Sequence, residues 1–148
     1  MLQKTLARRA DEIYLLLRLL AGLMFSFHGM QKVFGVLSPF QPPVGSQLWV
    51  GGIIELVAGL AIAIGLFTPC AAFVASGTMA VAYLQFHWRF AFGKELFPAI
   101  NKGELALLYA LIFLYVACRG GGRFSVDAWR KARKGSSARL EQDPKRSP

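Results

Sequence analysis

Four ionisable side chains that could exchange a proton with a bound molecule lie within or beside long apolar runs: Glu55, His28, Lys32 and Glu104. A carboxylate or an imidazole can take up and release protons, and a lysine ammonium can donate to a carbonyl or an anion. Such groups are expensive inside a membrane span and are often functional there. We therefore take these four as the candidate ligand-binding residues.

Each candidate also has a structural explanation. Glu55 could pair with His28 or Lys32 and only fix the register of two helices, and His28 could be a satisfied core histidine. Lys32 could extend its ammonium to the membrane surface. Glu104 would stand in the first turn of a helix, where the helix dipole alone explains an acid. His87, near the end of another apolar run, fits the membrane interface.

The elements that must position these residues are four apolar runs, at residues 13–34, 48–67, 69–88 and 102–118. A helix needs about 17–25 residues to cross a hydrocarbon core of about 30 Å, and the last run meets this only marginally. Hydrophobic residues make up 55% of the 148-residue chain, charged residues only 17%, and the mean hydropathy is +0.44. The sequence predicts an all-α membrane protein, a bundle of four transmembrane helices over residues 13–118.

Charged segments flank this transmembrane domain: a cytoplasmic or interfacial segment (1–12), a second interfacial segment (119–133) and a disordered basic tail (134–148). From residue 119 onward there are nine basic and three acidic residues, and the N-terminus is also basic. Basic residues concentrate on the cytoplasmic side and lie against anionic headgroups. We therefore predict cytoplasmic N and C termini, with the lipid bilayer rather than nucleic acid as the partner of the tail.

This topology, with the helical rise of about 1.5 Å per residue, places the four candidates and His87 in the outer half of the bundle. Arg18 lies at the inner end, where its predicted partner is Asp127, in a structural ion pair. Small residues surround Glu55 and line the second and third runs, so close helix packing is expected and a homodimer is possible. The histidines and glutamates have no tight ligand spacing, so no metal site is predicted.

Sequence signals also predict where two of the helices begin. Thr68 followed by Pro69 reads as a cap and first helical residue of the third span. Asn101, with Glu104 three residues later, reads as a capping box for the fourth. A short interfacial helix is expected over residues 125–131.

The chain resembles the DoxX family of small bacterial membrane proteins. The resemblance rests on residues 18–22, 28–32, 65–68, 101–104 and 122–127, and on Glu55 with Gly59. It implies four transmembrane helices in the bacterial inner membrane and an association with sulfur and quinone redox chemistry, since the family name comes from a subunit of a thiosulfate:quinone oxidoreductase. Relatives are also described as membrane partners of soluble redox enzymes.

Two functions from different classes follow. In the first, Lys32 or His28 donates to a carbonyl of a quinone headgroup, and Glu55 relays the accompanying proton. The electrons would come from a partner, because no cofactor motif is present in the chain. In the second, the bundle is a non-catalytic scaffold whose basic tail recruits a soluble redox enzyme. A small transporter is a weaker third alternative, because four short spans would need to dimerise to form a path.

Overall fold

The computed structural model describes residues 2–141, and this part of the chain is helical with no strand. In chain order the elements are α1 (Leu2–Ala7), α2 (Ala10–Phe34), α3 (Gln47–Ile64), α4 (Thr68–Ala82), the π-helix η1 (Tyr83–Trp88), the 3₁₀-helix η2 (Lys94–Leu96), α5 (Pro98–Asn101), α6 (Glu104–Arg119) and α7 (Val126–Glu141). The all-α fold predicted from the sequence is therefore confirmed.

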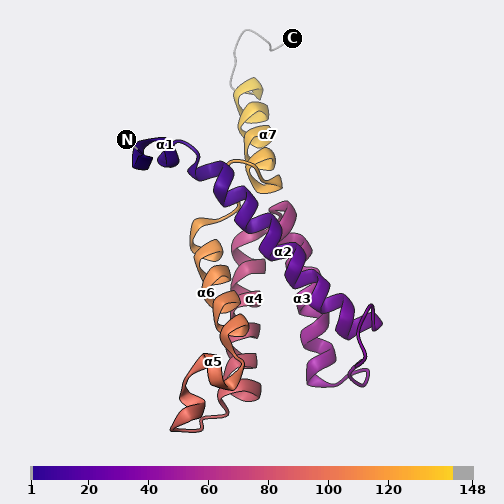
Figure 1. Cartoon of the computed structure of the whole chain (residues 1–148). Helices are drawn as coiled ribbons and strands as arrows, with labels where there is room; N and C mark the ends of the chain where they lie inside the picture. Colours follow the sequence, from indigo (N-terminus) through magenta and orange to yellow (C-terminus); the bar gives the residue numbers. More distant parts are fainter. Residues whose placement is uncertain (1, 142–148) are drawn as a thin grey trace.

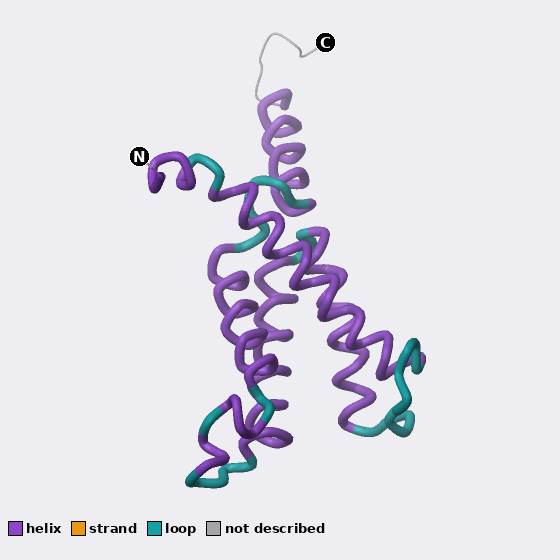
Figure 2. Tube along the Cα trace, in the orientation of Figure 1, coloured by secondary structure: helices purple, strands orange, loops and turns teal. Residues whose placement is uncertain are grey.

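Two antiparallel helix pairs make up the bundle (Figure 1). One pair is α2 with α3, and the other is α4, continued by η1, with α6. Helices α1 and α7 lie at one end, which we call the termini end. Residues 35–46 and 89–103 make their connections at the opposite end, which we call the loop end. The two pairs diverge toward the loop end, as the Cα trace also shows (Figure 2).

Among residues 2–141, three helical segments are long and apolar enough to cross a membrane by length and composition: Ala10–Phe34, Gln47–Ile64 and Thr68–Trp88. The fourth predicted span corresponds to α6, which has 16 residues and extends about 24 Å. This is shorter than a hydrocarbon core of about 30 Å. Helix α6 packs along α4 as a member of the bundle, and its crossing of the bilayer stays a prediction.

The C-terminal segment differs from the expected disordered tail. Helix α7 begins within the short helix predicted at residues 125–131 but continues to Glu141, so the structure has a helix over residues 134–141, where disorder is predicted. Ala, Lys, Arg, Leu and Glu make up most of α7 and favour a helix, although Gly135 does not. The Arg133 guanidinium lies 4.9 Å from the centre of the Trp129 ring, one turn away. The remainder of the predicted tail, residues 142–148, lies outside the described residues.

Glycines let the backbones of α2 and α3 approach closely. A Cβ added to Gly22 would lie 2.6 Å from the carbonyl oxygen of Gly59, and one added to Gly29 would lie 2.6 Å from that of Gly52. Real side chains do not fit at such separations. The glycine seam fixes the register of the two helices, and that register brings Glu55 of α3 beside Lys32 of α2.

Aromatic side chains join the two helix pairs in the middle of the bundle. Phe25 of α2 packs against Tyr109 and Phe113 of α6, with ring centroids 5.5 and 4.7 Å away. Within the second pair, the Ser76 hydroxyl of α4 donates to the carbonyl oxygen of Ala110 at 2.7 Å. These contacts hold α6 against both neighbours and place Tyr109 toward the loop end.

Candidate ligand site at the loop end

An ion pair between Lys32 and Glu55 forms the centre of the candidate site. Glu55 is 3% exposed, and its Oε1 accepts a hydrogen bond from Lys32 Nζ. The second carboxylate oxygen, Oε2, is buried and has no hydrogen-bond partner. A buried polar atom left unpaired costs about 1–3 kcal/mol, and more when it is charged. The site therefore contains a polar atom that a bound molecule could satisfy.

A cavity of about 170 Å³, which we call the polar cavity, opens beside this ion pair. Its polar lining consists of His28, Lys32, Glu55, His87, Lys102 and Tyr109. Tyr109 is 4% exposed, and its hydroxyl also lacks a partner. Its ring meets that of His28 edge-on, with centroids 6.3 Å apart. Two residues that line this cavity, Glu55 and Tyr109, thus each carry a buried polar atom without a hydrogen-bond partner.

A second cavity, which we call the apolar cavity, has a volume of about 290 Å³ and lies between α3 and α4 with η1. Lys32 and Glu55 line both cavities. The rest of its wall is mostly aliphatic and aromatic, including Val50, Ile54 and Val81. The ion pair therefore stands where a polar space meets an apolar one.

The π-helical turn η1 serves both cavities. Phe86 lines the apolar cavity, and the next residue, His87, lines the polar cavity. His87 Nδ1 lies 3.3 Å from the carbonyl oxygen of Asn101. Because a carbonyl only accepts, this hydrogen bond requires the proton on Nδ1 and leaves Nε2 of the neutral ring as an acceptor. Single π turns are frequent at functional sites.

The structure brings together three of the four candidates, His28, Lys32 and Glu55. Glu104 is different: it is exposed at the first residue of α6 and lines neither cavity. Its inclusion among the ligand-binding candidates is therefore not supported by its position. An acid at this place is explained by its interaction with the helix dipole.

Asn101 does not cap α6 as expected. The helix begins at Glu104 with Gly103 as its N-cap residue, and no side chain caps it. Asn101 is instead buried, where its amide nitrogen donates to the carbonyl oxygen of Glu95 at 2.9 Å and its side-chain oxygen accepts from Gly103 N at 2.8 Å. Asn101 thus fixes the connection that precedes α6, and Lys102 in this connection lines the polar cavity.

Sequence reasoning missed Tyr109 and Lys102 as members of the site. Tyr109 lies five residues into α6, about 7 Å along its axis, so a depth argument that included tyrosines could have located it. Lys102 gave no such signal. Its position depends on a left-handed backbone conformation, φ 59°, at the end of α5. Lysine has no preference for this conformation, so the sequence does not indicate it.

Arg18 and Asp127 do not form the predicted ion pair. Arg18, 1% exposed, donates through Nη1 to the carbonyl oxygens of Ile62 and, at 2.9 Å, Ala63, and through Nη2 to that of Phe124 at 2.8 Å. The carbonyls of Ile62 and Ala63 are in the last turn of α3, where helical donors run out, and that of Ile62 also accepts from the N–H of the C-cap residue Gly65 at 3.1 Å. The cation therefore binds a helix C-terminus, as the helix dipole favours.

Asp127 occupies the complementary place at the start of α4. Its carboxylate accepts from Phe67 N at 2.9 Å, and from Thr68 N and Thr68 Oγ1 at 2.8 Å each. Burial alone would raise the pKa of Asp127, but the hydrogen bonds from Thr68 and Phe67 outweigh it and lower the pKa. Thr68, predicted as the cap, is the first residue of the helix, and Asp127 caps it from a distant segment.

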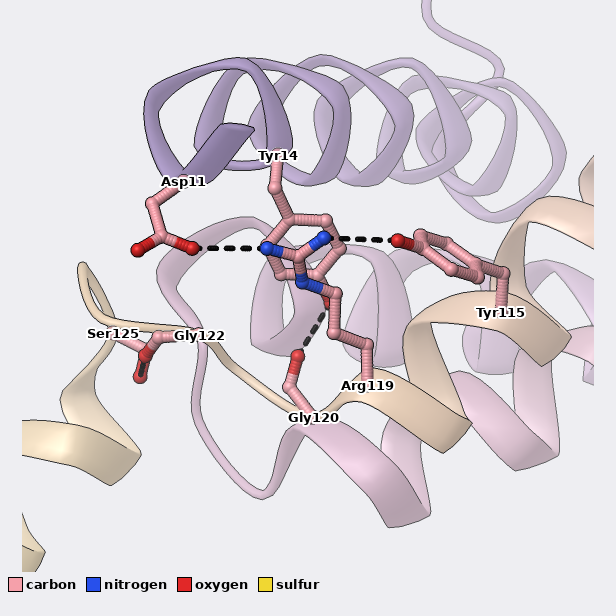
Figure 3. A network of polar contacts seen from close by, with 7 residues as sticks. All are labelled: Asp11, Tyr14, Tyr115, Arg119, Gly120, Gly122 and Ser125. Atoms are coloured by element: carbon pink, nitrogen blue, oxygen red, sulfur yellow. Dashed lines mark hydrogen bonds and ion pairs between the residues drawn. The ribbon is translucent and has the colours of Figure 1, made fainter. Parts of the chain in front are cut away.

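A second network ties α6 to the start of α2 at the termini end (Figure 3). Arg119 donates to Asp11 and to the Tyr115 hydroxyl, both at 2.9 Å, and lies 4.2 Å from the centre of the Tyr14 ring. The Tyr14 hydroxyl donates to the carbonyl oxygen of Gly120. Both helix pairs are therefore held together at the end opposite to the candidate site.

Within the described part of the chain, no three His, Cys, Asp or Glu side chains gather as a metal site would require. The chemistry available to the candidate site is therefore that of a carboxylate, imidazoles, ammonium groups and a phenol.

These features define a class: a small helical membrane protein with an ion-paired polar cavity near one end of its bundle. The DoxX family model matches residues 13–88, and the chain belongs to this family. A protein of Haemophilus influenzae, described as an uncharacterized protein, is 40% identical over 115 residues, which cover 75% of this chain and 85% of that protein. No solved structure matches the chain. The family match includes Lys32 and Glu55 and ends before Tyr109.

Proposed function

We propose that this protein is a multi-pass protein of the bacterial inner membrane that binds a quinone headgroup in the polar cavity. The observation that carries the proposal is the Lys32–Glu55 pair, with Glu55 Oε2 and the nearby Tyr109 hydroxyl buried without partners. A quinone carbonyl accepts hydrogen bonds, and the cavity offers donors from Lys32, Lys102 and Tyr109. Glu55 Oε2 only accepts, so its partner in this proposal is a hydroxyl of the reduced form, the quinol. Apolar side chains such as Phe25 and Met79 complete its lining and suit a ring.

In this proposal Glu55 relays the protons. Reduction of a quinone to a quinol consumes two electrons and two protons, and the electrons come from a soluble redox enzyme bound to the membrane protein. The buried carboxylate, held by one ammonium, can accept a proton at Oε2 and pass it to a ligand oxygen. The phenol of Tyr109 holds the ligand by donating to it.

The orientation of the site belongs to the same proposal. Basic residues concentrate in α1, in α7 and around them, at the termini end. The positive-inside rule then places this end in the cytoplasm and the candidate site in the outer half of the bilayer. A crossing by α6 is part of this arrangement.

Quinone titration of the purified protein in mild detergent tests the site. Glu55→Gln keeps the shape of the side chain but cannot take up a proton, and Tyr109→Phe removes one donor. Glu55→Gln weakens the charged hydrogen bond that positions Lys32, worth about 1.5–3 kcal/mol, so this variant is expected to bind quinone about tenfold or more weakly. Tyr109→Phe loses a neutral hydrogen bond of about 0.5–1.5 kcal/mol and should bind quinone about threefold to tenfold more weakly. Glu104→Gln, outside both cavities, is the matched control and should bind like the wild type. Equal quinone affinity in the wild type and Glu55→Gln would remove the basis of the proposal.

A second candidate function, recruitment of a soluble redox enzyme by a non-catalytic scaffold, is favoured by α7. This helix extends beyond the bundle at the termini end (Figure 1), with Lys131 and Lys134 exposed. Truncation before α7 would also remove Asp127 and its cap on α4, so charge reversal is the cleaner test. If the scaffold function holds, Lys131→Glu with Lys134→Glu abolishes co-purification of the enzyme, while Glu55→Gln has no effect on its activity.

A further inference from the structure

We infer that the apolar cavity between α3 and α4 holds the hydrocarbon tail of the ligand whose headgroup occupies the polar cavity. The inference rests on the proposed function and adds to it a tail-binding path with its own residues. The proposed occupant is an isoprenoid chain that is covalently attached to the headgroup.

The two cavities share the ion pair in their linings, and the rest of the two linings differs in polarity. Lys32 and Glu55 line both of them. Glu55 Oε2, which is buried and has no hydrogen-bond partner, belongs to this shared part of the two linings. Beyond this shared part, the wall of the apolar cavity is formed by residues such as Ile54, Val81 and Phe86. A molecule with a polar ring and an apolar chain matches this order of surfaces.

Two glycines keep the apolar cavity open. A Cβ added to Gly51 of α3 or to Gly77 of α4 would meet no atom within 4 Å, although both residues line the cavity. This differs from Gly22 and Gly29, where an added Cβ would collide with the backbone of α3. Close helix packing therefore explains the glycines of the seam but not Gly51 and Gly77, whose missing side chains leave space in the cavity wall.

The cavity is bridged at its loop end and bordered by exposed apolar side chains at its side. Gln47 at the start of α3 donates through Nε2 to Gln85 Oε1 of η1, and Gln47 itself lines the cavity. Val50 and Val81, on opposite walls, are 46% and 45% exposed. In a bilayer such exposed apolar residues contact lipid, so a hydrocarbon chain would enter sideways between α3 and α4.

The test compares two ligands with the same quinone ring, one without a tail and one with a long isoprenoid tail, on purified full-length protein. Gly77→Leu places a side chain in the cavity and should raise the Kd of the tailed quinone about tenfold, the scale of an apolar pocket mismatch. The Kd of the tail-less quinone should not change. Gly51→Leu, from the opposite wall, should repeat this result. Val57→Leu, exposed on α3 outside both cavities, is the control.

The outcomes separate this inference from the proposed function. Each quinone partitions into the detergent to the same extent with every variant. This partition cancels when the Kd of a variant is divided by the Kd of the wild type for the same quinone. Loss of both ligands in Glu55→Gln, with an unchanged tailed-quinone Kd in both leucine variants, keeps the headgroup site but overturns the tail path. Equal weakening of both ligands by Gly77→Leu and Gly51→Leu also overturns it. No effect of Glu55→Gln on either ligand contradicts the headgroup site itself.

Discussion

A buried charge, Arg18, and a half-buried one, Asp127, lie at the turn between α3 and α4 and show how single residues stabilise this fold. Arg18 donates to carbonyls at the C-terminus of α3, and Asp127 accepts from amides at the N-terminus of α4. Each charge interacts with the helix end whose dipole has the opposite sign, so neither needs the other as a direct partner. The same arrangement brings the segment before α7 against the bundle, because Phe124 accepts from Arg18 and Asp127 N donates to Gly65 O at 2.9 Å.

The lowered pKa of Asp127 predicts a pH dependence of stability. A carboxyl whose folded-state pKa lies below its unfolded value of about 3.8 stabilises the fold fully above that value. This contribution is lost as the pH falls through the lower, folded-state pKa. Thermal unfolding in detergent should therefore show a smaller acid-induced loss in Asp127→Asn than in the wild type between about pH 5 and pH 2. Identical pH profiles would contradict the capping role.

Arg18→Ala should destabilise the protein by about 3 kcal/mol or more, because the carbonyls of Ala63 and Phe124 lose the guanidinium donor and that of Ile62 keeps only the N–H of Gly65. Arg18→Lys keeps the charge, but a single ammonium cannot reproduce the fork of the guanidinium, so an intermediate loss is expected. Denaturant or thermal unfolding of the three proteins in the same detergent measures this order. A lysine variant as stable as the wild type would show that charge alone suffices.

At the scale of the helical elements, the glycines fall into two groups with different roles. Gly29 belongs to the close contact between α2 and α3, whereas Gly77 faces open space in the apolar cavity. Both residues are glycines, and the difference lies in what surrounds them: the backbone of a neighbouring helix at Gly29 and open space at Gly77.

This difference predicts opposite effects of the same substitution. Gly29→Ala should destabilise the bundle by about 1–3 kcal/mol, because the new methyl group meets the backbone of α3. Gly77→Ala has room and should be neutral or stabilising by up to about 1 kcal/mol, since alanine favours the helix. Unfolding measurements on both variants check the sign, and similar effects at the two positions would argue against the seam.

The helices themselves could be predicted from the sequence because the length and hydrophobicity of each run limit it to few structures in a membrane protein. The approximate level of His28, Lys32 and Glu55 followed from the rise per residue alone. The partners of Arg18 and Asp127 could not be predicted in this way, because they are helix ends contributed by distant segments. The π turn at His87 and the left-handed Lys102 depend on backbone hydrogen bonding that leaves no pattern in the residue types.

For the whole molecule, the arrangement of the two helix pairs places α1 and α7 at the same end (Figure 1). This agrees with an even number of crossings only if α6, with its 16 residues, also passes through the bilayer. A helix of this length can do so where the bilayer thins locally or flanking residues extend to the interface. Lys102 and Arg119 stand at the two ends of α6 and could act in this way.

Reporter fusions test this topology. A reporter active only in the periplasm should be silent when fused after Pro148 and active when inserted at Gly45, an exposed position of the loop end. An insertion at Gly93, also exposed, should match Gly45 and differ from Pro148 if α6 crosses. The same signal at Gly93 and Pro148 would show that α6 lies within one leaflet.

The networks of Arg18, Asp127 and Arg119 fasten the helix pairs at the termini end, whereas the exposed Gln47–Gln85 hydrogen bond links α3 to η1 at the loop end. Each pair therefore resembles a lever arm whose pivot is its firmer attachment, at the termini end. Helix α3 has 18 residues and extends about 27 Å, so a rotation of about 5° at the pivot moves its far end by about 2 Å. A displacement of that size is about half the contact distance of about 3.5–4.0 Å between two carbon atoms. Small rotations at the termini-end contacts, a full helix length away, would therefore produce larger changes in the separation of the helix pairs around Lys32 and Glu55.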